Sequence, residues 1–137
     1  MYFVDRGQIE AKLNYLEKLS AFLQESDENI MSLTEQLALE RAVHMSIEAI
    51  LDVGNQMIDG FIMRDPGSYE DIIEIMQDEQ VVPEDEAKQL IQLIQLRRQL
   101  VTDYTQVDGK QLWQGYKQAK EALRLFPERI RRYLNEH

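Results

Sequence analysis

The chain has 137 residues and a formal net charge of −10, and its length suits a single domain, residues 1–137, with its own hydrophobic core. It contains no cysteine and two histidines, which excludes disulfides, thiolate nucleophiles and multi-histidine metal centres, and no cofactor is predicted. No apolar run is long enough to span a membrane, and the N-terminus lacks a signal-peptide pattern. We therefore expect a cytoplasmic protein without a membrane partner.

The charge is unevenly distributed along the chain. Residues 1–107 carry 8 basic and 21 acidic side chains, whereas residues 108–137 carry 7 basic and 4 acidic ones. The stretch 65–86 contains nine acids and no base, and we expect no DNA partner because phosphate binding depends on lysine and arginine. The basic C-terminal part could hold RNA or an acidic partner, or it could be a solvated helix with cations near its C-terminus.

Apolar residues at helical spacing divide the chain into helical segments. In chain order, we predict helices over residues 5–25, 32–61, 68–79, 83–104 and 108–126, followed by a short basic piece over 128–135. Four of them begin with a capping-box spacing, namely Asp5 with Gln8, Ser32 with Glu35, Ser68 with Asp71, and Asp108 with Gln111. Pro83 is expected at a first helical position, and Pro127 is expected to end a helix. No segment alternates with period two, so the sequence predicts an all-α, antiparallel four-helix-type bundle with additional short helices.

The predicted helix 83–104 places a charge within its apolar face. Leu90, Ile94, Arg97, Val101 and Tyr104 fall on one stripe, with Arg97 near the middle of a wide apolar arc. A guanidinium there must be paired, extend out along its own stem, or reach a groove or interface, since burying an unpaired charge is prohibitive. Arg98 and Thr102 share a neighbouring stripe. On a continuous helix, Arg97 and Tyr104 would lie about 10 Å apart along one face.

The predicted helix 32–61 contains a matching polar feature. Glu40 lies almost central to its core face, Gly54 suggests close approach by another backbone, and a polar stripe runs alongside. The groove candidates on this helix are Glu40, Arg41, His44, Glu48 and Asp52. They could form a metal or acid–base site, or an internal polar seam in which Glu40 or Glu48 pairs with Arg97. The second interpretation is favoured, because one histidine among scattered carboxylates is weak support for a metal.

At these residues the chain resembles the HepT-like family, part of the HEPN superfamily of small α-helical proteins. The resemblance covers nearly the whole chain, including 39–52, the turn 64–69, and 97–104 followed by Asp108. The family motif is Arg, a polar residue, a short gap, His, any residue, then Tyr. Arg97, Arg98 and Tyr104 match it, whereas Thr102 occupies the histidine position and Asp103 the free one.

The resemblance implies a helical bundle that forms a homodimer with its motif helices facing each other. It also implies a metal-independent ribonuclease paired with a nucleotidyltransferase antitoxin that can adenylylate Tyr104. The implied catalytic residues are Arg97, Arg98, Thr102 and Tyr104, and RNA is the implied substrate. Cleavage through the 2′-hydroxyl needs a proton acceptor near neutral pKa and a cation for the phosphorane charge.

Thr102 raises a second hypothesis. Threonine cannot exchange a proton near neutral pH, and loss of general acid–base catalysis costs about 10²–10⁴ in rate unless His44 or Asp103 compensates. The alternative to a ribonuclease is therefore a non-catalytic family member that binds a partner protein or nucleotide through the same groove. The width of the apolar face on 83–104 separately predicts a two-fold homodimer with this helix at the interface.

Overall fold

The computed structural model describes residues 3–27 and 32–137, and these residues are entirely helical apart from their connections. The elements are α1 (Arg6–Glu25), α2 (Leu33–Gly60), α3 (Tyr69–Asp78), α4 (Glu84–Gln95), α5 (Arg97–Val101), the 3-10 helix η1 (Tyr104–Gln106) and α6 (Gly109–Glu136). Within the described ranges there is no strand, which confirms the predicted all-α class. No helix there is long and apolar enough to cross a membrane.

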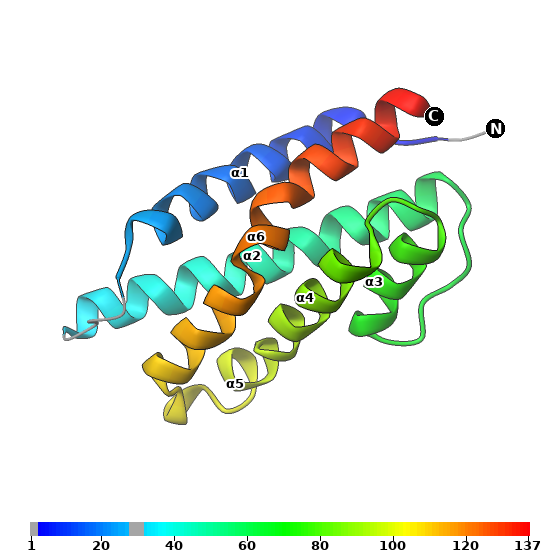
Figure 1. Cartoon of the computed structure of the whole chain (residues 1–137). Coiled ribbons are helices and arrows are strands. Elements are labelled where there is room, and N and C mark those ends of the chain that lie inside the picture. The colour runs from blue at the N-terminus through cyan, green and yellow to red at the C-terminus, as the bar shows by residue number, and fades with distance from the viewer. Residues whose placement is uncertain (1–2, 28–31) are drawn as a thin grey trace.

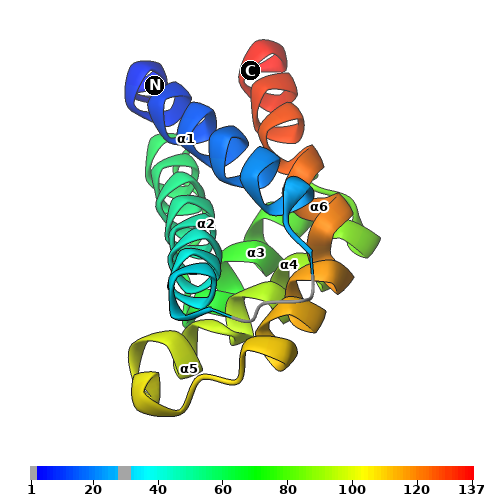
Figure 2. The same ribbon diagram turned by 90° about the vertical axis from the view of Figure 1, so that its left-hand side faces the viewer.

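The long helices α2 and α6 pack against each other, and each of them also contacts helices from both the N-terminal and the middle part of the chain (Figure 1). Helix α1 packs on α2 and on the C-terminal half of α6, whereas α3 packs on α2 and α4, and α4 packs along α6 (Figure 2). Helix α5 lies at one end, where it contacts α2 and the end of α4. One cluster of buried side chains draws residues from α1, α2, α3, α4 and α6.

The four predicted capping patterns are confirmed. In each case the side chain at the N-cap accepts a hydrogen bond from a backbone N–H of the first turn, which otherwise has no partner. The bonds are Gln8 N to Asp5 at 3.0 Å, Glu35 N to Ser32 at 3.0 Å, Asp71 N to Ser68 at 3.0 Å, and Lys110 N and Gln111 N to Asp108 at 3.0 and 3.3 Å.

The prediction of one helix over 83–104 is wrong. Helix α4 ends at Gln95, the backbone N–H of Leu96 turns back to Leu93 O at 3.0 Å, and α5 then ends before a turn at 102–103. The break seats Leu96 against α6: a Cβ at Gly115 would lie 2.8 Å from Leu96 Cδ1. The spacing of apolar residues does not reveal such a break, because two short helices that follow each other keep nearly the same helical spacing as one long helix. Pro83 also occupies the N-cap of α4 rather than its first helical position.

Helix α6 continues through Pro127, so the predicted end at that proline is also wrong. A proline inside a helix removes one backbone hydrogen bond and crowds the preceding turn. Here Phe126, Pro127 and Ile130 are all buried, and burial of their apolar surface offsets that cost. The predicted short basic piece is the last two turns of α6.

Gly54 allows α3 to pack closely on α2. A Cβ at this position would lie 2.5 Å from Ile72 Cγ2 and 3.1 Å from Met76 Cε. The predicted close approach is therefore present, but it is made by side chains of α3 rather than by backbone. This contact fixes the position of α3, whose first residues border the site described below.

Tyr116 is a buried residue with a testable effect on stability. It is 1% exposed, its hydroxyl has no hydrogen-bond partner in the described part of the chain, and burial raises its pKa to about 12. We expect Tyr116→Phe to leave the free energy of unfolding unchanged at neutral pH or to raise it by up to about 1 kcal/mol, because an unpaired buried hydroxyl is removed.

The pH dependence provides the matching readout. The pKa of Tyr116 is raised in the folded state, so ionisation of this side chain opposes folding. The free energy of unfolding is therefore unaffected below the unfolded-state pKa near 10 and falls as the pH rises from there toward 12. Urea unfolding between pH 9 and about 12 should therefore show a steeper loss of stability in the wild type than in Tyr116→Phe. Equal slopes, or a large destabilisation of the variant at neutral pH, would contradict this assignment.

Candidate functional site

Arg97 connects three helices at one end of the bundle. It is the first residue of α5, and its Nε donates a hydrogen bond of 2.6 Å to Glu48 Oε1 of α2. Its guanidinium carbon lies 4.6 Å from the ring centroid of Tyr69, the first residue of α3. The hydrogen bond to Glu48 raises the pKa of Arg97, although desolvation opposes it. The cation is thus paired and half-buried, as one of the interpretations of helix 83–104 predicted.

A pocket of about 180 Å³ lies beside this arginine. Its lining combines the start of α3, the end of α4 and the α5 segment: Tyr69, Glu70, Ile94, Gln95, Arg97, Arg98 and Thr102. Three of the four motif residues therefore line one cavity. Thr102, which occupies the motif's histidine position, is exposed and lines this pocket. Two guanidinium groups beside one cavity can bind a phosphate and stabilise negative charge that develops on it.

Tyr104 lies outside this pocket. It begins η1, beyond the turn at 102–103, and is 68% exposed. The expected face shared by Arg97 and Tyr104 two turns apart does not exist, because the helix is interrupted between them. The ring is nevertheless available to solvent, which is the condition for its modification.

The groove candidates on α2 divide into two groups. Glu48 Oε1 accepts from Arg97 and also lies 3.5 Å from His44 Nε2, so the two residues belong to the Arg97 site. Glu40 instead accepts a hydrogen bond of 3.1 Å from Gln36 Nε2. Arg41 and Asp52 are exposed and do not line the pocket. The polar seam is therefore present and uses Glu48, not Glu40.

A metal site is the competing interpretation of the same stripe. Among the residues that the structure describes, no group of three His, Asp or Glu side chains lies close enough together to hold a metal ion. His44 and Glu48 are the stripe residues that approach each other, at 3.5 Å, and Glu48 in turn pairs with Arg97.

Tyr69 is the site residue that sequence reasoning missed. It appeared only as part of the turn 64–69, yet its ring packs on Arg97 and lines the pocket. Asp71 fixes this turn by accepting from Arg64 Nη1 and Nη2 at 2.7 and 2.8 Å and from Gly67 N at 2.9 Å. The hydrogen bonds from Arg64, then from Gly67, hold the pKa of the Asp71 carboxyl well below its usual range. The signal in the sequence was an aromatic residue directly after a helix cap.

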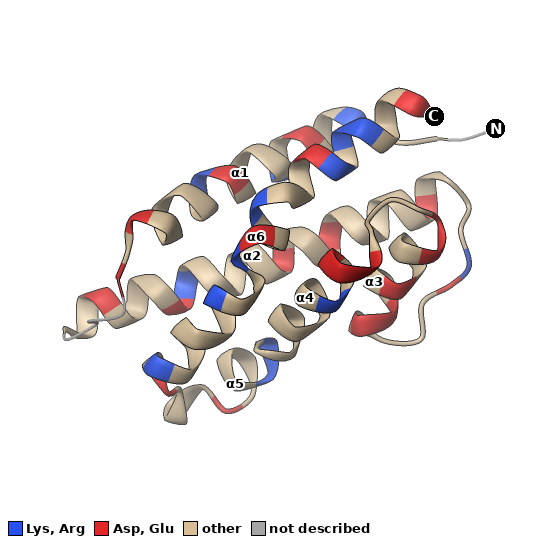
Figure 3. Ribbon diagram, in the orientation of Figure 1, with Lys and Arg blue, Asp and Glu red and all other residues tan. Residues whose placement is uncertain are grey.

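Most arginines at the basic C-terminal end are paired within the protein. Arg124 pairs with Glu121, Arg129 with Glu86 at 2.7 Å, and Arg131 with Glu10 and Glu17 at 2.8 Å each. Figure 3 shows acidic residues over α3 and the start of α4, and also on α1 and α2, with basic residues along α6. These pairs favour the structural interpretation of the basic end over a continuous RNA-binding surface.

Comparisons with known proteins agree with this architecture. A family model described as "Ribonuclease HepT-like" matches residues 12–130. The Bacillus subtilis (strain 168) protein "Putative RNase YutE" is 50% identical over 134 residues, which is 98% of this chain and 92% of that protein. A solved structure of Bacillus subtilis YutE, described as a cytosolic protein of unknown function, matches with a TM-score of 0.95 at 48% identity, covering 99% of this chain and 94% of that one.

Two more distant structures share the fold alone. One is a tri-AMPylated Shewanella oneidensis HEPN toxin in complex with its MNT antitoxin, with a TM-score of 0.78 at 16% identity, covering 90% of this chain and 96% of that one. The other is a toxin–antitoxin structure with AMP-PNP, with a TM-score of 0.75 at 15% identity, covering 91% and 96%. Because the family model spans most of the chain and a half-identical relative aligns almost end to end, the chain belongs to the HepT-like ribonuclease family.

Proposed function

We propose that the protein is a HepT-like RNA endonuclease of a toxin–antitoxin pair and that it acts without a metal. The observation that carries the proposal is the pocket lined by Arg97, Arg98 and Thr102, where two cations border one cavity. Arg97 and Arg98 would hold the scissile phosphate and stabilise the charge of the phosphorane. Membership of the family supports the reaction class.

His44 is our candidate for the proton-exchanging group that Thr102 cannot supply. It is half-buried on α2, and it shares the carboxylate oxygen Glu48 Oε1 with Arg97. Imidazole is the side chain suited to proton exchange near neutral pH. Glu48 would then orient both His44 and Arg97. A 2′-hydroxyl that loses its proton to His44 would attack the adjacent phosphorus, and the 5′-oxygen would leave with a returned proton.

We further propose a homodimer in the cytoplasm that pairs with a nucleotidyltransferase antitoxin. Val101 and Tyr104 are 39% and 68% exposed at the end of the motif segment, which supports an interface or a modification site there. Two toxins with this fold were solved with antitoxins or nucleotides, one of them AMPylated. Transfer of adenylate would join Tyr104 Oη to the α-phosphorus of ATP and release pyrophosphate. Light scattering that shows a monomer at micromolar concentration would contradict the dimer.

The test of the proposal is cleavage of single-stranded RNA by the purified protein in the presence of a chelator. Arg97→Ala should lower the cleavage rate by roughly 10²–10³, because a donor to the developing charge is removed. Arg124→Ala, which removes an exposed arginine paired with Glu121 elsewhere on the protein, should have no effect. Cleavage that survives Arg97→Ala would overturn the proposal.

A non-catalytic function is the second candidate, and the ion pair of Arg97 favours it. Arg97 already donates a hydrogen bond to Glu48, and Thr102 stands in place of the motif histidine. The pocket could therefore bind a nucleotide or partner protein without cleaving RNA. RNA cleavage that is abolished by Arg97→Ala would exclude this candidate. An adjacent gene for a nucleotidyltransferase would favour the toxin pair.

A further inference from the structure

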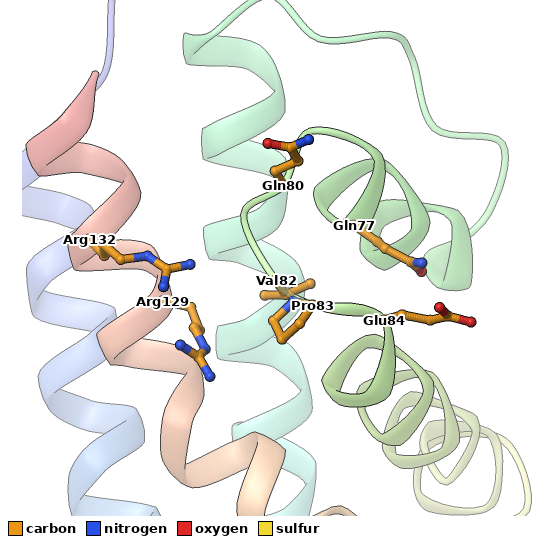
Figure 4. A pocket seen from close by; sticks show the side chains of 7 residues that line it. All are labelled: Gln77, Gln80, Val82, Pro83, Glu84, Arg129 and Arg132. Atoms are coloured by element: carbon orange, nitrogen blue, oxygen red, sulfur yellow. The ribbon is translucent and has the colours of Figure 1, made fainter.

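A second pocket lies near the opposite end of α4, where the α3–α4 connection faces α6. It has a volume of about 530 Å³ and is lined by Gln77, Gln80, Val82, Pro83, Glu84, Arg129 and Arg132 (Figure 4). It shares no residue with the motif pocket, which borders the end of α4, and Glu84 and Gln95 are separated by roughly 16 Å along the helix. Its chemistry therefore requires a separate explanation.

The two arginines of this pocket differ in their pairing. Arg129 uses Nε and Nη2 to bind the buried Glu86 at 2.9 and 2.7 Å, which leaves its Nη1. Arg132 is exposed, and no carboxylate of the described residues lies within 4 Å of it. In Figure 4 the guanidinium group of Arg132 extends from α6 toward the Val82–Pro83 side of the pocket, and that of Arg129 lies below it alongside α6. In an acidic protein whose neighbouring arginines are paired internally, Arg132 keeps its donors available for an outside anion.

Gln80 is held at the rim in a strained conformation. Its φ is 63°, in the left-handed region that favours glycine, and it follows the C-cap Glu79 of α3. Gln80 N donates to Gln77 O at 3.0 Å and Val81 N to Met76 O at 2.8 Å, which is the usual closure of a helix by a left-handed residue. Glycine or asparagine is the ordinary choice there, so glutamine carries an energetic cost, and a cost of this kind is typical of ligand sites.

From these observations we propose that this pocket binds a small organic anion. A carboxylate or phosphate group would lie against Arg132 and Nη1 of Arg129, because a guanidinium matches the geometry of both oxyanions. The amide side chains of Gln77 and Gln80, which both donate and accept, would bind an amide or base edge of the same molecule. Val82 and Pro83 supply the apolar part of the lining, and the Glu84 side chain points away from the two arginines in Figure 4, so the α6 side of the pocket is the side that suits an anionic group.

The experiment is a titration of the full-length protein followed by the side-chain amide resonances of its glutamines. One probe is N-acetylglycine, which carries a carboxylate and an amide, and the other is adenosine 5′-monophosphate, which carries a phosphate and a base edge. We expect at least one probe, at up to about 10 mM, to shift the amide signals of Gln77 and Gln80. The probe that binds more tightly identifies the carboxylate or the phosphate as the preferred anion.

Three variants make the test specific. Arg132→Gln should raise the dissociation constant about tenfold, because a charge-assisted hydrogen bond is lost. Gln80→Gly should also weaken binding several-fold, yet keep or raise the melting temperature, because glycine adopts this φ without strain. Arg124→Gln removes an arginine outside the pocket and should leave the dissociation constant unchanged.

Three results would overturn the proposal. The first is the absence of any shift at Gln77 and Gln80 with both probes. The second is equal weakening by Arg132→Gln and Arg124→Gln, which would indicate a general effect of net charge. The third is unchanged binding in Gln80→Gly. None of these results depends on RNA cleavage, so the test stands apart from the proposed ribonuclease function.

Discussion

Replacing Thr102 by histidine is expected to raise the rate of RNA cleavage by roughly 10²–10⁴, which is the usual contribution of a positioned acid–base group. Thr102 is exposed and lines the same cavity as Arg97 and Arg98, so an imidazole at this position would face the proposed phosphate site. The backbone there needs no rearrangement, because Thr102 N already donates to Arg98 O at 2.8 Å. Initial rates on single-stranded RNA with a chelator present measure the gain.

Two further variants show whether the gain comes from proton exchange. Thr102→Gln adds a polar side chain of similar length that cannot exchange a proton near neutral pH, and it should leave the rate near that of the wild type. Adding Arg97→Ala to Thr102→His should remove the gain, because the cation for the developing charge is missing. A folded Thr102→His variant without increased cleavage would mean that the cavity differs from an active site by more than one residue.

The roles of His44 and Thr102 can be separated by combining their variants, because Thr102 lines the cavity whereas His44 approaches it only through Glu48. If His44 supplies residual acid–base catalysis through its place beside Glu48, His44→Ala should lower the rate of the wild type but have a smaller effect on Thr102→His. Equal effects in both backgrounds would place His44 in a structural role. His44 lies on α2, whereas Thr102 follows the end of α5, so each residue can be replaced without altering the element that carries the other.

The starts of the helices could be predicted from the sequence because each depends on a few neighbouring residues. Asp5, Ser32, Ser68 and Asp108 cap the helices that they were expected to cap. The ends of helices depended on distant packing and were predicted less well. The break after Gln95 accommodates Leu96 against Gly115 of α6, and the continuation through Pro127 depends on a buried apolar face. Both contacts join residues that are far apart in the sequence, so the residues around each helix end do not predict them.

In the candidate site, too, some features could be predicted from the sequence and others depended on tertiary packing. A guanidinium on an apolar stripe had to find a partner, and Glu48 was one of two carboxylates expected to supply it. The contribution of Tyr69 could not be predicted, because it depends on where α3 begins relative to α5. The placement of Tyr104 was inferred from an unbroken helix and failed with that assumption. Pairing of charges can thus be anticipated from the sequence, whereas the choice of neighbours follows from tertiary packing.

Replacing Arg129 by methionine is expected to lower the free energy of unfolding by about 3 kcal/mol, the scale for breaking a buried ion pair from one side. The side chain of Glu86 is only 7% exposed, and Arg129 binds both of its carboxylate oxygens, at 2.9 and 2.7 Å. Methionine keeps much of the apolar stem but leaves the carboxylate buried without its cation. Urea unfolding at neutral pH measures the difference.

A double-mutant cycle separates the lost pair from lost packing. Glu86→Gln with Arg129→Met removes both charges, and the double variant should recover a large part of the stability lost in Arg129→Met, because no uncompensated charge remains buried. Arg124→Met is the matched control on the same helix: its pair with Glu121 is exposed to solvent, and such pairs contribute little to stability, so this variant should unfold close to the wild type. Additive losses in the Glu86 and Arg129 variants would contradict the assigned coupling. They would mean that α4 and α6 are held together by apolar packing alone, with the ion pair contributing nothing beyond the volume of its side chains.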